Sequence, residues 1–475
     1  MKNANILLIN CPNRLSRAPE FFPYGLGLLT AVLEEEGYYV EIYDLNLYRN
    51  QSEFFTFLRK NTKWDIIGVS GLITTYSYQV ELSKKIKSIC PDALLISGGG
   101  LASSVPTVLL SSSDFDVAII GEGEQIITKI AAHFETRELG NIPGIVWKST
   151  DGSIISNKDA VPIKNLDLIP FPNWDKAHLP DYFHFSGFNY KGVAAHNFTR
   201  RADLTTTRGC PHHCTFCFNV FCRSEIRMRT VDNVLAEIHE LINRYKIDSL
   251  DFLDENFCCS KERTIELCTK MIDNKFNLKW GTAARVDDVD KEMLLTMKEA
   301  GCVFILYGFE TGSQTMLDRM NKKITIEQSW NAFKMTEDIG IDARGNLIIG
   351  HPGENRQTLM ESLNFQKKRF HYLMDKCKTH PEKEMFLDDI KKRFSTVSLC
   401  TPYPGSQIYA ENKGKIGDIR EFLNNISLSD AKKFVVNLSN ISTEELLLFQ
   451  KLLSSPDSWI DAYGGDINDT MCIDK

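Results

Sequence analysis

Three cysteines close together in the chain are the residues best placed to do chemistry. Cys210, Cys214 and Cys217 lie within one short segment that follows a β-rich run. Closely spaced thiolates of one loop hold iron–sulfur clusters, and four irons with three protein ligands leave one iron open to a substrate-like molecule. A zinc site is the alternative, with His212 or His213 as its fourth ligand. The sequence favours iron–sulfur, because no second half-site of a zinc module lies nearby.

Composition limits what kind of protein can carry this segment. The chain has 475 residues, 43% of them hydrophobic and 25% charged, which predicts a globular protein with two or three domains. Its net charge of −7 offers no basic footprint for nucleic acid. Thirteen cysteines, an odd number in a long chain, favour metal binding over a disulfide framework. No apolar run is long enough for a membrane span or a signal peptide, so a cytoplasmic protein is expected.

The first 156 residues alternate short β-rich runs with amphipathic helical patterns. This rhythm predicts a parallel sheet with helices on both faces, a flavodoxin-like (Rossmann-type) domain that binds its ligand outside the carboxyl ends of the strands. Residues 144–156 predict a hairpin that turns at Asp151-Gly152. The expected strands are residues 6–9, 39–43, 66–70, 93–97 and 117–120.

A second βα series follows a proline-containing linker, which we place at residues 157–200. Six βα units in residues 201–405 predict a partial (β/α)6 TIM-like barrel, whose working face is the carboxyl ends of its strands. Residues 366–394 predict a charged helical extension, and residues 406–475 a small helical tail. The expected strands are residues 204–206, 249–253, 279–283, 303–307, 343–349 and 396–400.

The spacing Cys-x-x-x-Cys-x-x-Cys, with the aromatic Phe216 before the last cysteine, resembles the signature of the radical S-adenosylmethionine (SAM) superfamily. The resemblance implies that Cys210, Cys214 and Cys217 ligate a 4Fe-4S cluster whose open iron chelates the amino and carboxylate groups of SAM. It further implies that one-electron reduction cleaves SAM to a 5′-deoxyadenosyl radical. A reductant such as flavodoxin or ferredoxin is then an expected partner.

Polar residues after the next three expected strands resemble the SAM-contacting residues of that superfamily. Asp254 and Glu255 follow the second strand, where the methionine moiety of SAM is expected. Arg285 follows the third strand and suits a carboxylate, and Glu310 follows the fourth and suits an amine or ribose hydroxyls. Each could alone be a surface salt bridge. Their common place at strand ends favours a cofactor site.

The fifth expected strand carries two further SAM candidates, Asn346 and Gly350. The segment Gly350-His351-Pro352-Gly353-Glu354 resembles the superfamily motif in which a glycine lets the adenine approach the backbone. His351 departs from the apolar residue usual there. We expect a packed histidine rather than one that faces the substrate or cobalt.

Glycine-rich strand ends in the first domain suggest a second ligand. Ser70, Gly71 and Leu72 end the third expected strand, and Gly98 and Gly99 end the fourth. Such ends at a crevice suit a flat or phosphate-bearing ligand. The two segments resemble the Ser-x-Leu and Gly-Gly segments of cobalamin-binding domains, where the serine faces the nucleotide tail and the glycines admit it.

The rest of the first domain gives mixed support for cobalamin. Residues 23–28 and the segment Gly121-Glu122-Gly123-Glu124 match flanking segments of the cobalamin-dependent subfamily of radical SAM proteins. The loop from Asn10 to Pro23, however, lacks the Asp-x-His-x-x-Gly motif that would supply a histidine to cobalt. We therefore expect cobalamin without a lower His ligand. The alternative is a degenerate domain used for packing or partner contact.

Taken together, the resemblance implies a cobalamin-dependent radical SAM methyltransferase acting on an unactivated carbon or phosphorus centre. In that reaction one SAM remethylates cob(I)alamin and a second yields the radical that removes a substrate hydrogen. Radical rearrangement, cyclisation or oxidation is the second hypothesis, and a non-catalytic iron–sulfur scaffold or redox sensor a third. A methylthiotransferase is disfavoured, because its N-terminal cluster triad is absent. The substrate, a small molecule or a peptide, is not identified.

The remaining cysteines do not predict another site. Cys258, Cys259 and Cys268 form no recognised ligand spacing. A second cluster is therefore disfavoured against simple burial of the thiols.

Overall fold

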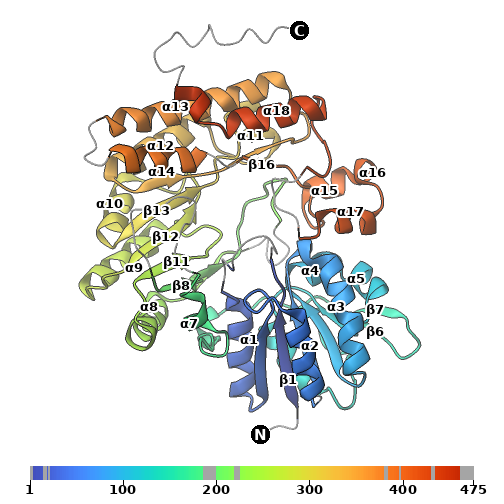
Figure 1. Cartoon of the computed structure of the whole chain (residues 1–475). Coiled ribbons are helices and arrows are strands. Elements are labelled where there is room, and N and C mark those ends of the chain that lie inside the picture. The colour runs from blue at the N-terminus through green and yellow to red at the C-terminus, as the bar shows by residue number, and fades with distance from the viewer. Residues whose placement is uncertain are drawn as a thin grey trace.

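Two α/β units lie side by side in the computed structural model of the chain (Figure 1). The described residues are 4–13, 19, 22–61, 63–185, 199–218, 225–378, 383–394, 397–428 and 434–460. Within them, no helix is both long and apolar enough to cross a membrane.

The first unit is a seven-stranded sheet in the order β2-β1-β3-β4-β5-β6-β7, with its first five strands parallel. The flavodoxin-like prediction is confirmed, and β6 and β7 form the predicted hairpin. Side chains alternate along β1, so Ile6 and Leu8 join one core while Leu7 and Ile9 join another. Both faces of the sheet are covered, which explains the continuous apolar strands. The strands are β1 (Asn5–Asn10), β2 (Tyr39–Asp44), β3 (Ile66–Ser70), β4 (Leu94–Gly98), β5 (Val117–Ile119), β6 (Ile145–Lys148) and β7 (Ile154–Ser156).

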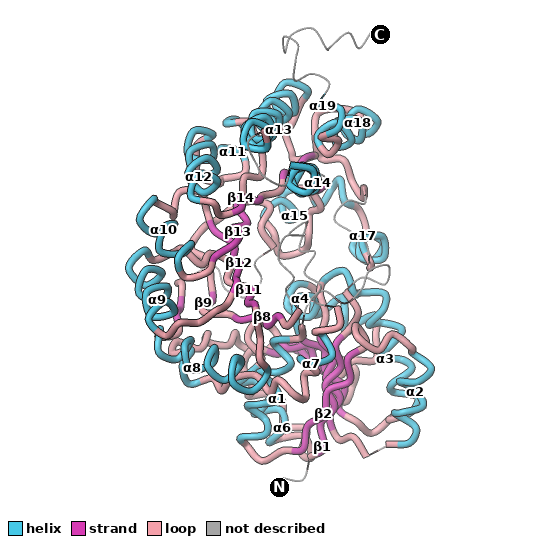
Figure 2. The backbone as a smooth tube through the Cα atoms, turned by 60° about the vertical axis from the view of Figure 1, so that its left-hand side comes forward, coloured by secondary structure: helices cyan, strands magenta, loops and turns pink. Residues whose placement is uncertain are grey.

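Six α-helices and a 3-10 turn connect these strands and cover the two faces of the sheet (Figure 2). They are α1 (Tyr24–Glu35), α2 (Gln51–Lys60), η1 (Ile73–Thr75), α3 (Tyr76–Ile89), α4 (Gly99–Ser104), α5 (Pro106–Ser112) and α6 (Glu124–Ala132).

The second unit is a partial barrel. Its main sheet is parallel in the order β14-β13-β12-β11-β8, and a parallel pair β15-β16 continues it through a bridge between Glu310 and Leu347. The six-unit barrel prediction is confirmed. The strands are β8 (Arg201–Leu204), β11 (Ser249–Phe252), β12 (Lys279–Ala284), β13 (Cys302–Tyr307), β14 (Asp342–Arg344), β15 (Leu347–Ile349) and β16 (Val397–Leu399).

The fifth barrel strand differs from the single strand expected over residues 343–349. It is broken between β14 and β15, at Gly345 and Asn346. The Phe309 ring occupies the space beside Gly345, within 2.2 Å of where a Cβ would lie. The backbone of Glu310 bonds across the break, accepting from the Ile348 N–H at 2.7 Å. The interruption therefore brings the end of β13 into contact with the fifth strand.

Helices on the outside of the barrel follow the strands, as the βα pattern predicted. They are α8 (Val231–Glu240), which continues into η3 (Leu241–Tyr245), α9 (Lys261–Asp273), α10 (Lys291–Glu299), α11 (Gln314–Arg319), α12 (Ile326–Ile339), α13 (Arg356–Cys377) and α14 (Lys383–Phe394).

The segment between the two units is packed rather than free over residues 157–185. It contains η2 (Leu166–Leu168) and α7 (Leu179–Tyr182). Trp174 is buried and stacks on Phe22 with ring centroids 5.1 Å apart. The Tyr182 hydroxyl donates to Asp44 at 2.7 Å. The Tyr245 hydroxyl of the barrel donates to Asp175 of the same segment at 2.7 Å, so this part of the expected linker contacts both units.

The C-terminal helices divide between the two units (Figure 1). Phe422 and Leu423 of α17 are buried in a core of the first domain, whereas Leu446 and Leu453 of α18 are buried in the barrel core. The helices are α15 (Gln407–Glu411), α16 (Lys413–Ile416), α17 (Ile419–Ile426), α18 (Thr443–Leu453) and α19 (Asp457–Ile460).

Candidate functional site

The cysteine loop leaves the carboxyl end of β8, at the face of the barrel that carries active sites. A short antiparallel pair, β9 (Thr207–Arg208) and β10 (Arg227–Met228), closes the base of the loop. Cys210, Cys214 and Cys217 are half-buried in it. Three thiols from one loop, none of them deep in a core, are the donor set that an iron–sulfur cluster requires.

Later barrel segments hold the cysteine loop in place through its backbone. The Thr215 N–H donates to the carbonyl of Met320 at 3.0 Å, and the Thr215 carbonyl accepts from the Ile408 N–H at 2.9 Å. The Asn321 side chain donates to the carbonyl of His213 at 2.8 Å. The loop is therefore fixed from both the fourth barrel unit and the C-terminal region.

Asp254 supports the start of this loop from behind. Its side chain is 2% exposed, and it accepts from the N–H groups of Thr206 and Thr207 at 2.7 and 2.6 Å. The Thr206 hydroxyl donates to its second oxygen at 2.7 Å. Burial raises the pKa of Asp254, and these hydrogen bonds oppose that rise. The carboxylate is thus engaged by the chain itself.

Glu255 is the acidic residue of this pair that faces open space. It lines a cavity between the two domains. Burial and the neighbouring Asp254 raise the pKa of its carboxyl, while a hydrogen bond from the backbone of Gly209 lowers it. Glu255 therefore connects the second barrel strand to the residue just before Cys210.

Arg285 and Glu310 come together around a buried lysine that the sequence analysis did not single out. Lys322 donates to Glu310 at 2.7 Å, and both side chains are about one-tenth exposed. Arg285 forms two hydrogen bonds of 2.9 Å to Asp287 and a third to the carbonyl of Lys322. Burial raises the pKa of Cys214, and the positive charges of Lys322 and Arg285 oppose that rise.

Nothing in the local sequence distinguishes Lys322 from a surface residue. It stands beside Lys323, which is exposed. Asn321 and Lys323 have φ angles of 53° and 58°, so the backbone turns sharply on either side of Lys322. Only this turn directs one of two adjacent lysines inward.

Phe216 of the cysteine loop packs against His351. Their rings are 6.4 Å apart in an edge-to-face arrangement, and Lys322 lies 5.9 Å from the Phe216 ring. His351 is 3% exposed, and its Nε2 lies 3.3 Å from the Thr215 hydroxyl. Burial lowers the pKa of His351 to about 4. His351 is therefore a neutral, packed residue that contacts the loop.

Asn346 and Gly350 flank β15. The carbonyl of Asn346 accepts from the Glu310 N–H at 3.3 Å. Gly350 has a φ of 88°, and a Cβ there would lie 3.1 Å from Leu446 of α18. This position requires glycine for both its conformation and its close packing.

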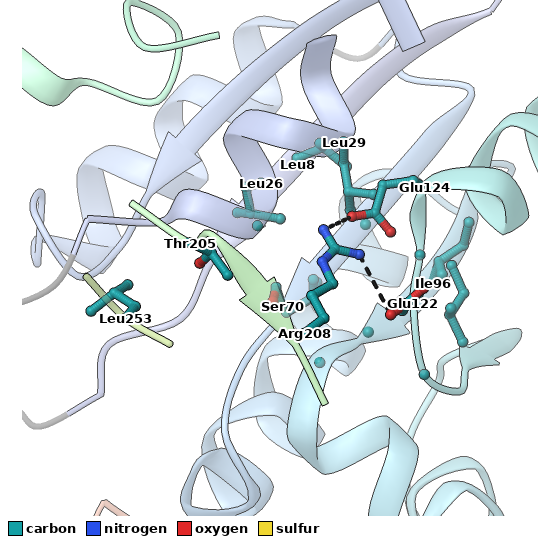
Figure 3. Close-up of a pocket in the computed structure, with 18 of the residues that line it drawn as sticks. Leu8, Leu26, Leu29, Ser70, Ile96, Glu122, Glu124, Thr205, Arg208 and Leu253 are labelled. Atoms are coloured by element: carbon teal, nitrogen blue, oxygen red, sulfur yellow. Dashed lines mark hydrogen bonds and ion pairs between the residues drawn. The ribbon is translucent and has the colours of Figure 1, made fainter. Parts of the chain in front are cut away.

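A cavity of about 350 Å³ lies between the strand ends of the first domain and the start of the cysteine loop (Figure 3). Ser70, Gly98 and Gly99, which the sequence assigns to a ligand of this domain, line it. Gly71 and Leu72 do not. Gly71 packs against the Thr75 and Gln79 side chains, and Leu72 is 50% exposed.

The first-domain wall of the cavity is short of side chains. A Cβ added at Gly25, Gly98 or Gly121 would meet no atom within 4 Å. Leu26 and Ile96 add apolar surface to this wall, and Glu122 and Glu124 add charged groups. No histidine occurs among the described residues that line it. The wall has room for a flat ligand such as cobalamin.

Comparisons with known proteins agree with this geometry. The sequence matches the Radical SAM superfamily over residues 204–365 and a B12 binding domain over residues 12–131. An uncharacterized methyltransferase of Pyrococcus horikoshii is 26% identical over 404 residues, which cover 82% of this chain and 77% of that protein. Cytidylyl-2-hydroxyethylphosphonate methyltransferase of Streptomyces wedmorensis is 26% identical over 398 residues, covering 73% of each protein.

Two further similarities extend the comparison. Anaerobic magnesium-protoporphyrin IX monomethyl ester cyclase of Rubrivivax gelatinosus is 28% identical over 368 residues, which cover 74% of this chain and 59% of the cyclase. The solved structure of OxsB, a cobalamin-dependent SAM radical enzyme, with aqua-cobalamin bound has a TM-score of 0.74 and 19% identity, and the similarity covers 98% of this chain and 68% of OxsB. The shared fold spans both domains. The chain contains a radical SAM domain and a B12-binding domain, so it is a radical SAM enzyme whose cofactors are a 4Fe-4S cluster, SAM and cobalamin.

Proposed function

We propose that this enzyme transfers a methyl group to an unactivated carbon or phosphorus centre. The observation that carries the proposal is a single cavity lined by both Gly98 of the first domain and Gly209 of the cysteine loop. A ligand of the first domain would there lie beside the residue that precedes Cys210. Two relatives named as methyltransferases support the same reaction.

The proposed roles divide the site between three cofactors. Cys210, Cys214 and Cys217 hold the cluster; Phe216, Glu255, Arg285, Glu310, Asn346 and Gly350 surround SAM; Ser70, Gly98 and Gly99 contact cobalamin. When bound, the cluster with SAM supplies a radical that removes a substrate hydrogen, and cobalamin supplies the methyl group. The protein holds these groups in place and excludes water.

Three residues take a different part in this proposal. Asp254 acts on the site through the backbone of Thr206 and Thr207, because both of its oxygens already accept hydrogen bonds there. Gly71 and Leu72 support the cobalamin-facing strand end from outside the cavity, where neither contributes to the lining.

The charges at the barrel edge suit the amino-acid end of SAM. Lys322 and Arg285 bring two positive charges to the neighbourhood of Cys214, and they pair with Glu310 and Asp287 respectively. A carboxylate of SAM would there approach cations that the protein already holds in place, so its binding would require little rearrangement of solvent. Glu310, paired with Lys322, is oriented to accept a hydrogen bond from the amine or a ribose hydroxyl.

A cyclisation or oxidation is the second candidate, because the cyclase of Rubrivivax gelatinosus is as similar in sequence as the methyltransferases. For either reaction we propose a flavodoxin or ferredoxin as electron donor and the cytoplasm as location. We also propose domain boundaries at residues 1–156, 157–200, 201–405 and 406–475.

The test uses the full chain reconstituted anaerobically with iron, sulfide and hydroxocobalamin, then desalted. Cobalamin retained per chain is measured first, and S-adenosylhomocysteine and 5′-deoxyadenosine are then counted after reduction with excess SAM. We expect near-stoichiometric cobalamin and both products. Formation of 5′-deoxyadenosine without S-adenosylhomocysteine would exclude methyl transfer and favour the second candidate.

A further inference from the structure

The segment Gly121-Glu122-Gly123-Glu124 has no role in the function proposed so far. It connects β5 to α6 at the carboxyl edge of the first sheet. The Glu122 and Glu124 side chains are only 11% and 8% exposed. Carboxylates are rarely buried without partners, because desolvation of their charge is costly.

Their partners are two arginines at the base of the cysteine loop. Arg208 lies in β9 and Arg227 in β10, and the two residues stand opposite each other in the antiparallel register. The three cysteines all lie between these arginines in the chain. The pair therefore marks where the loop leaves the barrel and where it returns.

The contacts between the two domains are direct and numerous. Arg227 donates to both oxygens of Glu122, at 3.0 and 2.5 Å. Arg208 donates to Glu124 at 2.6 Å and lies 3.6 Å from Glu122 (Figure 3). Glu122 also accepts from the N–H of Ile163, which belongs to the segment between the domains. Although burial alone would raise the pKa of Glu122, the Arg227 hydrogen bonds lower it, so the carboxylate stays charged.

We propose that Glu122 and Glu124 are positioning residues that clamp the base of the cysteine loop onto the first domain. We call the four side chains Glu122, Glu124, Arg208 and Arg227 the loop clamp. All four also line the interdomain cavity. An occupant of the cavity contacts the clamp, so filling the cavity restrains the cysteine loop. This second step rests on the proposed binding of cobalamin there.

Ion pairs suit this task better than apolar contacts. The attraction within a buried ion pair offsets the cost of desolvation only when the geometry is good. Such a pair therefore adds little net stability but favours one arrangement of its partners. Two-point binding of a guanidinium to a carboxylate fixes both distance and plane. The clamp thereby sets how far the loop lies from the cavity.

Hydrogen–deuterium exchange of residues 207–218 tests the clamp without any enzymatic turnover. The full chain is compared as wild type, Glu122→Gln and the control Glu81→Gln, each cofactor-free and after addition of hydroxocobalamin. Glu81 is a surface glutamate of the same domain, 64% exposed and paired with Lys84. Arg208→Gln is measured in parallel, in case Glu122→Gln fails to fold.

We expect exchange in residues 207–218 of Glu122→Gln and Arg208→Gln to be faster by about tenfold or more, because each substitution removes one charge of a buried ion pair. Hydroxocobalamin should slow exchange there in wild type and Glu81→Gln but not in the clamp variants. Unchanged exchange in folded Glu122→Gln and Arg208→Gln would overturn the clamp.

The experiment separates the clamp from the proposed function. If wild type retains no hydroxocobalamin, the cobalamin proposal fails, yet the cofactor-free comparison still decides the clamp. If all variants retain hydroxocobalamin and none changes its loop exchange, the clamp fails and the cobalamin proposal stands.

Discussion

Two parallel sheets meet at their carboxyl edges in this enzyme, and the two edges are built from opposite materials. Much of the first-domain edge is bare, with Gly98 and Gly121 leaving open space where side chains would lie, and the carboxylates of Glu122 and Glu124 on this edge are paired with arginines of the cysteine loop. The edge of the barrel is crowded with charge, where Lys322 pairs with Glu310 and Arg285 with Asp287. The first edge offers mostly room, and the second offers mostly fixed charges.

The difference shows how each edge can select its ligand. A large cofactor with many neutral amides needs volume and apolar wall, and it gains little from charges that would have to be desolvated. A small zwitterion needs oriented charges in a site of low polarity. The two edges should therefore fail independently.

The largest effect should come from the cysteine loop. Replacing Cys210, Cys214 and Cys217 together by alanine should abolish iron binding and SAM cleavage, because no cluster ligands remain. Hydroxocobalamin retention should stay near that of wild type, since the bare edge is unchanged. Iron, sulfide and cobalamin per chain are measured after reconstitution. Cys259→Ala, a half-buried thiol outside the loop, is the control and should keep its iron.

Filling the bare edge should produce the converse result. Gly98 has an extended backbone that any residue can adopt, so Gly98→Leu adds only side-chain volume to the cavity. We expect cobalamin retention to fall by about 100-fold, by analogy with the cost of overpacking a filled site, while cluster content stays unchanged. Gly140→Leu is the control, because a Cβ there also meets nothing and the residue is exposed. Loss of the cluster in Gly98→Leu would show that the edges are not independent.

The sequence predicted the two edges unequally. The strand positions, the cysteine spacing and the glycines at strand ends depend on local patterns, and these predictions were specific. The pairing of Lys322 with Glu310 depends on the turn between α11 and α12, which no periodicity reports. The orientation of Asp254 toward Thr206 could not be read either, because a strand-end carboxylate can face the ligand or the chain. Contacts between elements distant in sequence decided both cases.

Removing the charge beside the cluster tests the crowded edge. Lys322→Met leaves Glu310 buried without its cation, which should lower the free energy of unfolding by about 4 kcal/mol and raise the Kd for SAM by about tenfold. Cobalamin retention should not change. Denaturation of the cofactor-free chain and SAM binding to the reconstituted enzyme measure the two effects. The matched control is the exposed neighbour in Lys323→Met; equal effects of both substitutions would contradict a specific role for Lys322.

The smallest effect concerns the same edge at acid pH. Burial lowers the pKa of His351 from 6.5 to about 4. Between these pH values the residue is protonated in the unfolded chain and neutral in the folded chain. The contribution of neutral His351 to the free energy of unfolding is complete above pH 6.5 and is lost as the pH falls toward 4. The loss is about 3 kcal/mol at pH 4.

Urea denaturation of cofactor-free wild type, His351→Gln and the exposed control His133→Gln at pH 7 and pH 4.5 isolates this contribution. Acid titration of other groups affects all three proteins alike, so the difference between variants reports His351 alone. His351→Gln should lose about 2.5 kcal/mol less than wild type between the two pH values, from the same linkage relation. An equal loss of the free energy of unfolding in all three proteins would mean that buried His351 can be protonated without destabilising the folded chain.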